Sequence, residues 1–181
     1  LVTSDQKFTT TSLVVKGDLN GADILILREM AGSDKKGVAT EGKLEVLDLT
    51  EANFVAGGGD YYDKSNTEKG SPADATVGSY CFAGTILKEV KLPNSVTKIK
   101  DSAFEKCAAL TSVTFSKDVT EVGASAFSGC TSLKSFEFPK VKTVSAYVLF
   151  GCTALTKVVI PETVTDLKGY IFKNCSALTE I

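Results

Sequence analysis

The cysteines are the residues of this sequence whose type and spacing come closest to those of a chemical site. Four of the five recur at intervals of 23, 22 and 23 residues, namely Cys107, Cys130, Cys152 and Cys175. Evenly spaced thiols in a straight stack cannot converge on one tetrahedral metal ion, so no zinc site is expected. A ladder of small buried side chains is the favoured interpretation, and disulfides between adjacent rungs are the alternative. Cys81 falls outside this series and is predicted to be the most accessible thiol.

The sequence contains no histidine, which limits the chemistry open to it. Ser-His-Asp and Cys-His catalysis and H-E-x-x-H metal sites all require this side chain. The glycine motifs G-x-x-x-x-G-K-[ST] and G-x-G-x-x-G are absent as well. Carboxylates are scattered, and Asp60 and Asp63 lack the ligand spacing of known calcium loops. These absences exclude the common histidine-dependent and phosphate-loop designs, and paired-carboxylate chemistry stays formally possible. No catalytic residue, cofactor or metal is predicted from the residues.

Charge and hydropathy exclude two further classes of partner. The formal net charge is −2, so no overall field attracts nucleic acid or an anionic membrane. The longest aliphatic run, Ile24 to Leu27, is far shorter than the roughly 20 apolar residues that cross a bilayer. The sequence thus predicts neither a nucleic-acid partner nor a membrane span.

A repeated apolar pattern indicates the architecture that positions these residues. Leucines recur at intervals of 23, 23, 22 and 23 residues, and the first four each open a segment L-x-x-[VF]-x-[LFI]: Leu87, Leu110, Leu133, Leu155 and Leu178. Within a segment alternate residues, such as Val90 and Leu92, are predicted to point inward. A fixed period of this length predicts a solenoid in which equivalent side chains form continuous interior columns. We expect short parallel strands on one face, and turns with short helical segments on the other.

The residues ahead of the repeats predict a cap and an insertion. A strand over 13–16 is expected to end at Gly17, and a helix over about 21–31 to begin at Asn20, with Asp23 beside the helix start. A first strand rung is predicted over about 44–49. The domain prediction is a capping region over 1–56 with that helix and rung, an inserted loop over 57–79, and the repeat array over 80–181.

Two surfaces are candidates for binding a partner. The outward stripe of the strands is mixed in charge, and its more common role is simple solvation: Val46, Asp48, Glu89, Lys91, Ser112, Thr114, Ser135, Glu137, Lys157 and Val159. The inserted loop carries Tyr61 and Tyr62 between Asp60 and Asp63, beside three glycines, and these tyrosines are predicted to be exposed aromatics of the kind that anchor interfaces. The alternative for this loop is a flap packed over the side of the solenoid.

The repeat pattern resembles a known family. The form L-x-x-[VI]-x-[LFI]-P-x-x-V-x-x-[IV]-x-x-x-[AY]-F-x-x-C is similar to the BspA-like, Treponema-type leucine-rich repeat, and the segment 17–32, the strand 47–49 and the glycines 57–59 resemble the N-terminal region of those proteins. The sequence departs from the pattern at Ser116 and at a third copy that is one residue short. A fifth copy breaks off at Ile181, so further sequence, a partner or an atypical ending is expected to cover that edge.

The resemblance implies a function rather than a site. Family members are mostly surface-exposed or secreted bacterial proteins, often lipid-anchored, that act in adhesion and protein binding and have no catalytic residues. It implies an exported, cell-surface recognition module for a protein or glycan on a host or neighbouring cell, with the export signal already removed. The alternatives are a structural spacer of a larger surface protein, or an enzyme whose catalytic part lies outside this chain.

Overall fold

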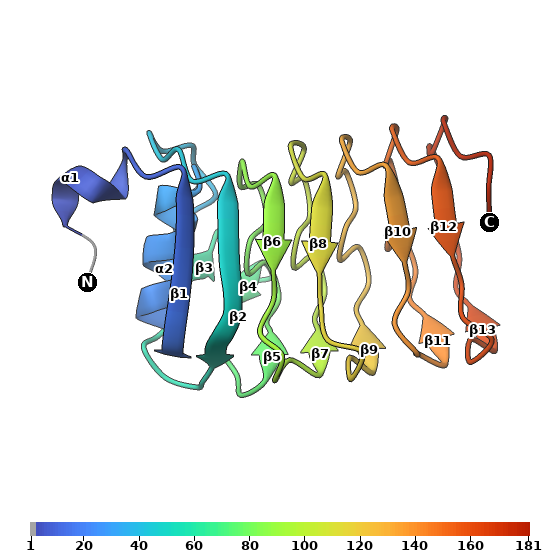
Figure 1. Ribbon diagram of the computed structural model, residues 1–181, viewed down its shortest axis with the longest axis horizontal. Helices are drawn as coiled ribbons and strands as arrows, with labels where there is room; N and C mark the ends of the chain where they lie inside the picture. The colour runs from blue at the N-terminus through green and yellow to red at the C-terminus, as the bar shows by residue number, and fades with distance from the viewer. Residues whose placement is uncertain (1–2) are drawn as a thin grey trace.

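Successive coils of the chain stack along one axis in the computed structural model, which describes residues 3–181 (Figure 1). Strands at equivalent repeat positions pair in parallel, for example Val90 with Val113 and Phe136 with Val158. The repeated leucines are fully buried in a single core: Leu87, Leu110, Leu133 and Leu155. This arrangement confirms the predicted solenoid, because one repeat position occupies one column.

Two columns of strands run along the stack. The first lies on the face shown in Figure 1 and contains β1 (Ser12–Leu19), β2 (Val46–Phe54), β6 (Glu89–Lys91), β8 (Ser112–Thr114), β10 (Ser135–Glu137) and β12 (Lys157–Val159). The second contains β5 (Thr76–Val77), β7 (Lys98–Ile99), β9 (Glu121–Val122), β11 (Thr143–Val144) and β13 (Asp166–Leu167). From β5 onward the strands of both columns have only two or three residues, because each coil must turn again within its 22 or 23 residues.

The remaining side of each coil is a ladder of turns. Its backbone N–H groups donate to carbonyls one coil further on, as from Phe82 to Ala103 at 2.8 Å and from Phe104 to Ala126 at 2.7 Å. Two positions per coil adopt left-handed backbone angles: Tyr80, Ser102, Ser125, Tyr147 and Tyr170 at the first, and Gly84, Lys106, Gly129, Gly151 and Asn174 at the second. The sequence predicted turns and short helical segments on this side, and within residues 80–181 the structure has turns there and no helical segment.

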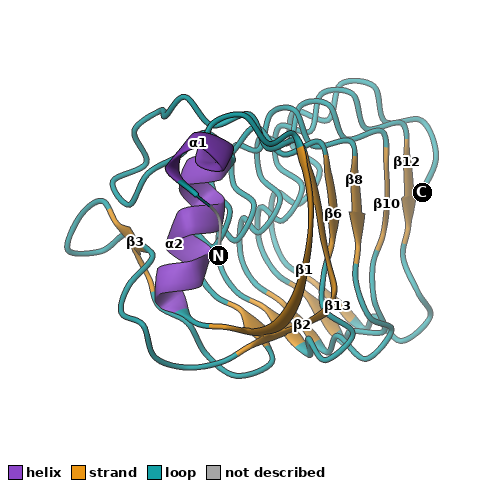
Figure 2. Ribbon diagram, turned by 60° about the vertical axis from the view of Figure 1, so that its left-hand side comes forward, coloured by secondary structure: helices purple, strands orange, loops and turns teal. Residues whose placement is uncertain are grey.

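The N-terminal region covers the first end of the stack. After α1 (Ser4–Lys7), β1 continues the first column by pairing with β2, and α2 (Gly21–Met30) lies across the molecule from β1 (Figure 2). α2 begins at Asn20, as predicted, with a capping box between Asn20 and Asp23. β1 does not end at Gly17, because pairing with the long strand β2 continues to Leu19 after an irregularity between Val14 and Lys16.

The inserted segment is shorter than the sequence predicted. It contains the small hairpin of β3 (Tyr62–Asp63) and β4 (Lys69–Gly70), and β5 then pairs with β7 as a regular member of the second column. The stacked coils therefore begin ahead of residue 80. We refer to residues 57–75 as the flap.

The glycine run at the start of the flap allows a close approach to α2. The N–H of Gly21 donates to the carbonyl of Gly57 at 2.9 Å, so the flap crosses the first turn of the helix. Gly58 has a positive φ of 74°, and a Cβ there would lie 2.1 Å from Oδ1 of Asn20. Glycine is required at this position because a side chain would collide with the helix cap.

A buried arginine terminates the turn ladder at its N-terminal end. The carbonyls of Cys81 and Ala83 occupy acceptor positions in the first turn of the ladder, where no earlier coil supplies N–H donors, whereas the carbonyl of Tyr80 already accepts from Ala83 N–H at 3.2 Å. Nη1 of Arg28 donates to Tyr80 O at 2.8 Å and to Cys81 O at 3.0 Å, and Nη2 donates to Ala83 O at 3.3 Å. The guanidinium thus supplies hydrogen-bond donors at the end of the ladder, where no earlier coil does so. Arg28 is fully buried, and burial lowers the pKa of its guanidinium.

Candidate partner-binding groove

Both strand columns are interrupted at the same coil boundary. In the first column β1, β2, β6 and β8 form one sheet, and β10 and β12 form another. In the second column β9 pairs with β7 and β11 pairs with β13, but β9 and β11 do not pair with each other. Figure 1 shows β8 and β10 further apart than β6 and β8. The turn ladder continues across this boundary, with Phe127 N–H donating to Val148 O at 2.9 Å. The coils therefore stay joined on one side and part along both strand columns.

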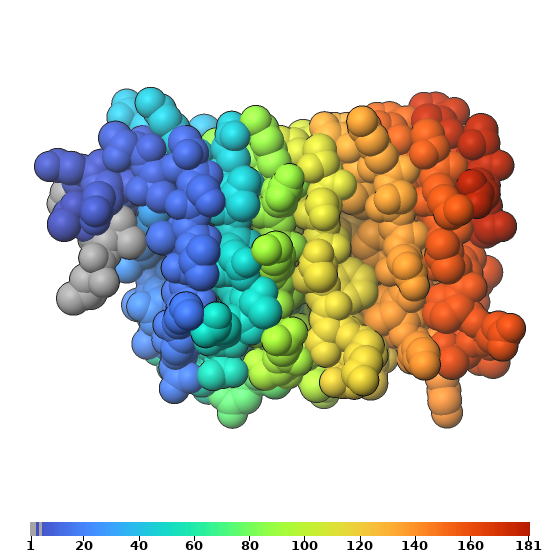
Figure 3. All heavy atoms as spheres, viewed as in Figure 1, coloured from blue at the N-terminus to red at the C-terminus, as the bar shows by residue number. Residues whose placement is uncertain are grey.

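The parting opens a groove on the strand face. It has a volume of about 490 Å³ and is lined by the segments 111–117 and 135–140, with Pro161. This volume lies within the range of ligand sites, roughly 300 to 1,000 Å³. In Figure 3 the groove lies between the yellow surface of β8 and the orange surface of β10. We call it the β8–β10 groove.

Bulky side chains fill the layer at this boundary. Phe136 occupies the repeat position that Val90 has in the first copy. The position of Leu92 is taken by Phe115 in the second copy and by Phe138 in the third. The ring centroids of Phe115 and Phe136 are 6.0 Å apart, and those of Phe136 and Phe138 are 4.9 Å apart. The third copy is one residue short before Val141, so Val144 follows Val122 after 22 residues. Both features coincide with the one coil boundary, among the described residues, at which neither strand column is paired.

Elsewhere on the stripe, both lysines pair with a carboxylate of an adjacent coil. Lys91 pairs with Asp48 at 2.9 Å, and Lys157 pairs with Glu180. Hydrogen bonds from Thr50 and Lys91 lower the pKa of the Asp48 carboxyl to about 2. Neither Glu137 at the groove nor Glu89 on β6 forms an ion pair within residues 3–181. The polar groups at the groove are therefore available to a partner.

The structure brings together only some of the predicted stripe residues. Four of them line the β8–β10 groove: Ser112, Thr114, Ser135 and Glu137. Glu89 and Lys91 lie on β6 and Lys157 lies on β12, outside it. Lys117 and Lys140 also line the groove and were not predicted from the sequence. The available signals were the run of phenylalanines and the shortened third copy.

The tyrosines of the flap are not exposed, which corrects the sequence prediction. Tyr61 is 0% exposed and Tyr62 5%. The hydroxyl of Tyr61 donates to Ser79 O at 3.1 Å, and burial raises its pKa. The ring of Tyr62 stacks on Tyr80 at 4.9 Å, with the Arg28 guanidinium 4.8 Å from its centroid. Because both rings pack inside, these contacts support the alternative of a flap over the side of the solenoid.

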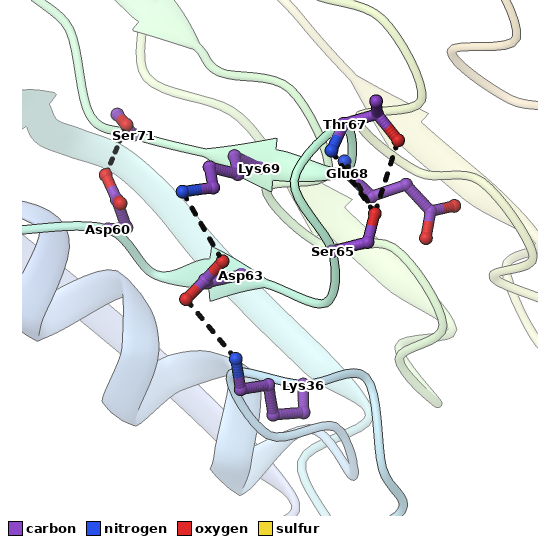
Figure 4. A network of polar contacts seen from close by, with 8 residues as sticks. All are labelled: Lys36, Asp60, Asp63, Ser65, Thr67, Glu68, Lys69 and Ser71. Carbon is purple, nitrogen blue, oxygen red and sulfur yellow. Dashed lines mark hydrogen bonds and ion pairs between the residues drawn. The ribbon is translucent and has the colours of Figure 1, made fainter.

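The acidic residues of the flap are engaged within the flap and its neighbouring loop. Asp63 pairs with Lys36 at 3.3 Å and with Lys69 at 3.8 Å (Figure 4). The hydrogen bond from Lys36 lowers the pKa of the Asp63 carboxyl. Asp60 accepts a hydrogen bond from Ser71. These contacts hold the flap in place, so Asp60 and Asp63 are weaker candidates for partner binding than the groove.

The cysteines form the ladder that their spacing predicted. Each of the four periodic thiols donates to a backbone carbonyl of the preceding coil, as from Cys130 to Phe104 O and from Cys152 to Phe127 O, both at 3.3 Å. All five thiols are free. Cys81, predicted to be the most accessible, is fully buried beneath the cap, and Cys175 is the most exposed of the five.

The buried thiols make stability depend on pH. Burial raises the pKa of Cys152 to about 12, whereas an unfolded thiol ionises near pH 8.5. The stabilisation is therefore complete below about pH 8.5 and is lost as the pH rises toward 12. Between pH 8 and 9.5 wild type should lose about 1 kcal/mol more unfolding free energy than Cys152→Ala. Urea unfolding at both values measures this, and parallel losses in the two proteins would contradict it.

Two findings limit other functions. Within residues 3–181 no cluster of three His, Cys, Asp or Glu side chains is arranged to hold a metal ion. Neither α1 nor α2 has the length and apolar character needed to cross a bilayer, and the described part of the chain contains no other helix.

The paired strand columns, the turn ladder and the leucine core define a leucine-rich repeat solenoid. A family model described as "BspA type Leucine rich repeat region" matches residues 70–181 in six copies. The chain therefore belongs to the BspA-type leucine-rich repeat family. A search among curated proteins gave no match.

Solved structures agree with this assignment. A leucine rich cell surface protein from Faecalibacterium prausnitzii A2-165 is 40% identical, covering 52% of this chain and 25% of its own, with a TM-score of 0.51. The leucine-rich repeat protein of T. pallidum is 20% identical over 99% of this chain and 76% of its own, with a TM-score of 0.63. A leucine-rich repeat protein from Eubacterium ventriosum ATCC 27560 is 24% identical over 94% of this chain and 48% of its own, with a TM-score of 0.57. The last two likenesses concern the fold alone.

Proposed function

We propose that this chain is a non-enzymatic recognition or adhesion module of an exported bacterial cell-surface protein. Its partner is a protein or glycan, bound on the strand face at the β8–β10 groove. The observation that carries the proposal is the opening of an otherwise closed strand face, where Ser112, Thr114, Ser135 and Glu137 line one cavity. Support for the cell surface comes from the F. prausnitzii relative, which is described as a cell surface protein.

A matched pair of variants tests this function. Ser112 on β8 lines the groove, and its partner Glu89 lies one coil earlier on β6, which is paired on both sides. We expect Ser112→Trp to block the groove and Glu89→Trp to leave it open. Each protein is applied to arrays of purified extracellular-matrix proteins and glycans. Binding that is weakened by Ser112→Trp and kept by Glu89→Trp supports the proposal.

The other outcomes separate the alternatives. If wild type binds no array component, the structural spacer is favoured. Equal weakening by both tryptophans would indicate recognition by the whole stripe rather than by the groove. Circular dichroism of each variant verifies that the solenoid has folded, so a loss of binding is not a loss of structure.

A further inference from the structure

We propose that the β8–β10 groove captures an extended peptide segment of the partner protein, which lies along it as an added strand. This inference rests on the proposed function, because it names the chemistry of the partner at the same site. Strand addition requires a sheet edge whose backbone groups are unpaired, and side-chain surfaces that select the peptide. The groove presents two such edges facing each other.

The free edge of β8 follows from its bonds to β6. Ser112 N–H donates to Lys88 O at 3.2 Å, and Thr114 O accepts from Leu92 N–H at 2.8 Å, so the backbone groups of both residues point to β6. Alternate residues of a parallel strand direct these groups to opposite neighbours. The N–H and C=O of Val113 therefore point toward β10, with which β8 forms no pair.

The free edge of β10 follows in the same way. Phe138 N–H donates to Val159 O at 3.0 Å, and Lys134 O accepts from Thr156 N–H at 2.9 Å, so positions 134, 136 and 138 face β12. Ser135 and Glu137 consequently direct their N–H and C=O groups toward β8. The two edges provide donors and acceptors on both sides of the groove, as a guest strand requires.

The lining of the groove fits an extended chain. Its accessible apolar surface on the β8 side comes from the partly exposed Val113 and Phe115, with the buried Phe136 and Phe138 beneath, which suits one alternating face of a strand. The hydroxyls of Ser112, Thr114 and Ser135 can bond the polar groups of the guest. A glycan would use these hydroxyls, but it has no regular N–H and C=O ladder to match the two backbone edges. The backbone geometry therefore favours a peptide.

Two lysines at the groove determine which residue type is favoured at one end of the guest strand. Lys117 and Lys140 follow β8 and β10, line the groove, and form no ion pair within the described residues. Both lie where their strands end, so their ammonium groups meet one end of the guest strand. Glu137 also lines the groove, but the two ammonium groups outnumber its carboxylate, so an acidic residue at that end would be attracted and a basic one repelled.

The experiment uses peptides of defined backbone and charge. Hexapeptide amides that alternate Val or Ile with Thr or Ser are made in two sets, ending in Asp or in Lys. N-methylated copies of the strongest binders remove the backbone donors. Affinities for wild type, Ser112→Trp and Glu89→Trp are measured by fluorescence polarisation, and amide hydrogen exchange is followed with and without peptide.

The expected results concern both affinity and exchange. Asp-ended peptides should bind better than Lys-ended ones, and N-methylation or Ser112→Trp should weaken binding about ten-fold or more, with little change in Glu89→Trp. Peptide should slow exchange at Val113, Ser135 or Glu137, while Val90, already inside the paired sheet, should change little. N-methylated peptides that bind equally, or unchanged exchange at all three amides, would overturn strand capture.

Failure of the peptides does not by itself reject the proposed function. Glycan or matrix-protein binding that Ser112→Trp abolishes, without any peptide binding, would overturn strand capture and keep the groove as the recognition site. If no tested ligand responds to Ser112→Trp, both proposals fail. A preference for Lys-ended peptides would reject the role given to Lys117 and Lys140.

Discussion

Replacing Arg28 with methionine is expected to lower the free energy of unfolding by about 3 to 5 kcal/mol, although the apolar stem of the side chain is largely kept. The guanidinium bonds Cys81 O and Ala83 O, and it also bonds Ser33 Oγ at 3.0 Å and Asp34 O at 3.2 Å. Each buried carbonyl left without a donor costs about 1 to 3 kcal/mol. The loss is large because Arg28 ends the turn ladder from inside the core.

Arg28→Lys is the matched control for this prediction. Lysine keeps the charge, but its single ammonium group cannot reach all the carbonyls to which the two terminal nitrogens of the guanidinium donate. We expect its loss of stability to be substantial but smaller than that of Arg28→Met. Urea unfolding followed by circular dichroism and tyrosine fluorescence measures both, since the protein has five tyrosines and no tryptophan. A loss below about 1 kcal/mol for Arg28→Met would contradict the role of Arg28 as the end of the ladder.

The repeated part of the fold was predictable because its information is local and periodic. Residues equivalent to Phe104, Cys107 and Leu110 recur at intervals of 22 or 23 residues. A stack with one core follows from this period alone. The cap helix was predictable for a similar reason, since Asn20 and Asp23 form its capping box within a few residues. In both cases the residues that decide the structure are close in sequence or repeated at one interval.

The errors concern residues whose surroundings come from distant parts of the chain. Tyr62 lies in a glycine-rich segment that indicates exposure, yet it is buried between Arg28 and Tyr80. Cys81 is covered by the cap in the same way. The groove combines several weak signals, because large phenylalanines and a one-residue deletion matter only when adjacent coils are placed together. Stripe residues were predicted individually, and the structure shows which four share a cavity.

Phe104→Ala tests whether stability in this solenoid is a property of neighbouring coils. The ring of Phe104 is fully buried between Phe82 and Phe127, with centroid distances of 5.4 Å and 5.2 Å. Truncation removes both stacking contacts and leaves a cavity in a central coil, so we expect a loss of about 3 to 5 kcal/mol in unfolding free energy. The measurement is urea unfolding at neutral pH.

Phe172→Ala is the matched control, because Phe172 occupies the same repeat position near the other end of the stack. Its side chain is only half-buried, and no aromatic ring stacks on it within the described residues. We expect it to cost less than half as much as Phe104→Ala. Equal losses would mean that each coil contributes independently of its neighbours. A larger loss for Phe104→Ala follows from nearest-neighbour coupling, since a central coil supports an interface on each side.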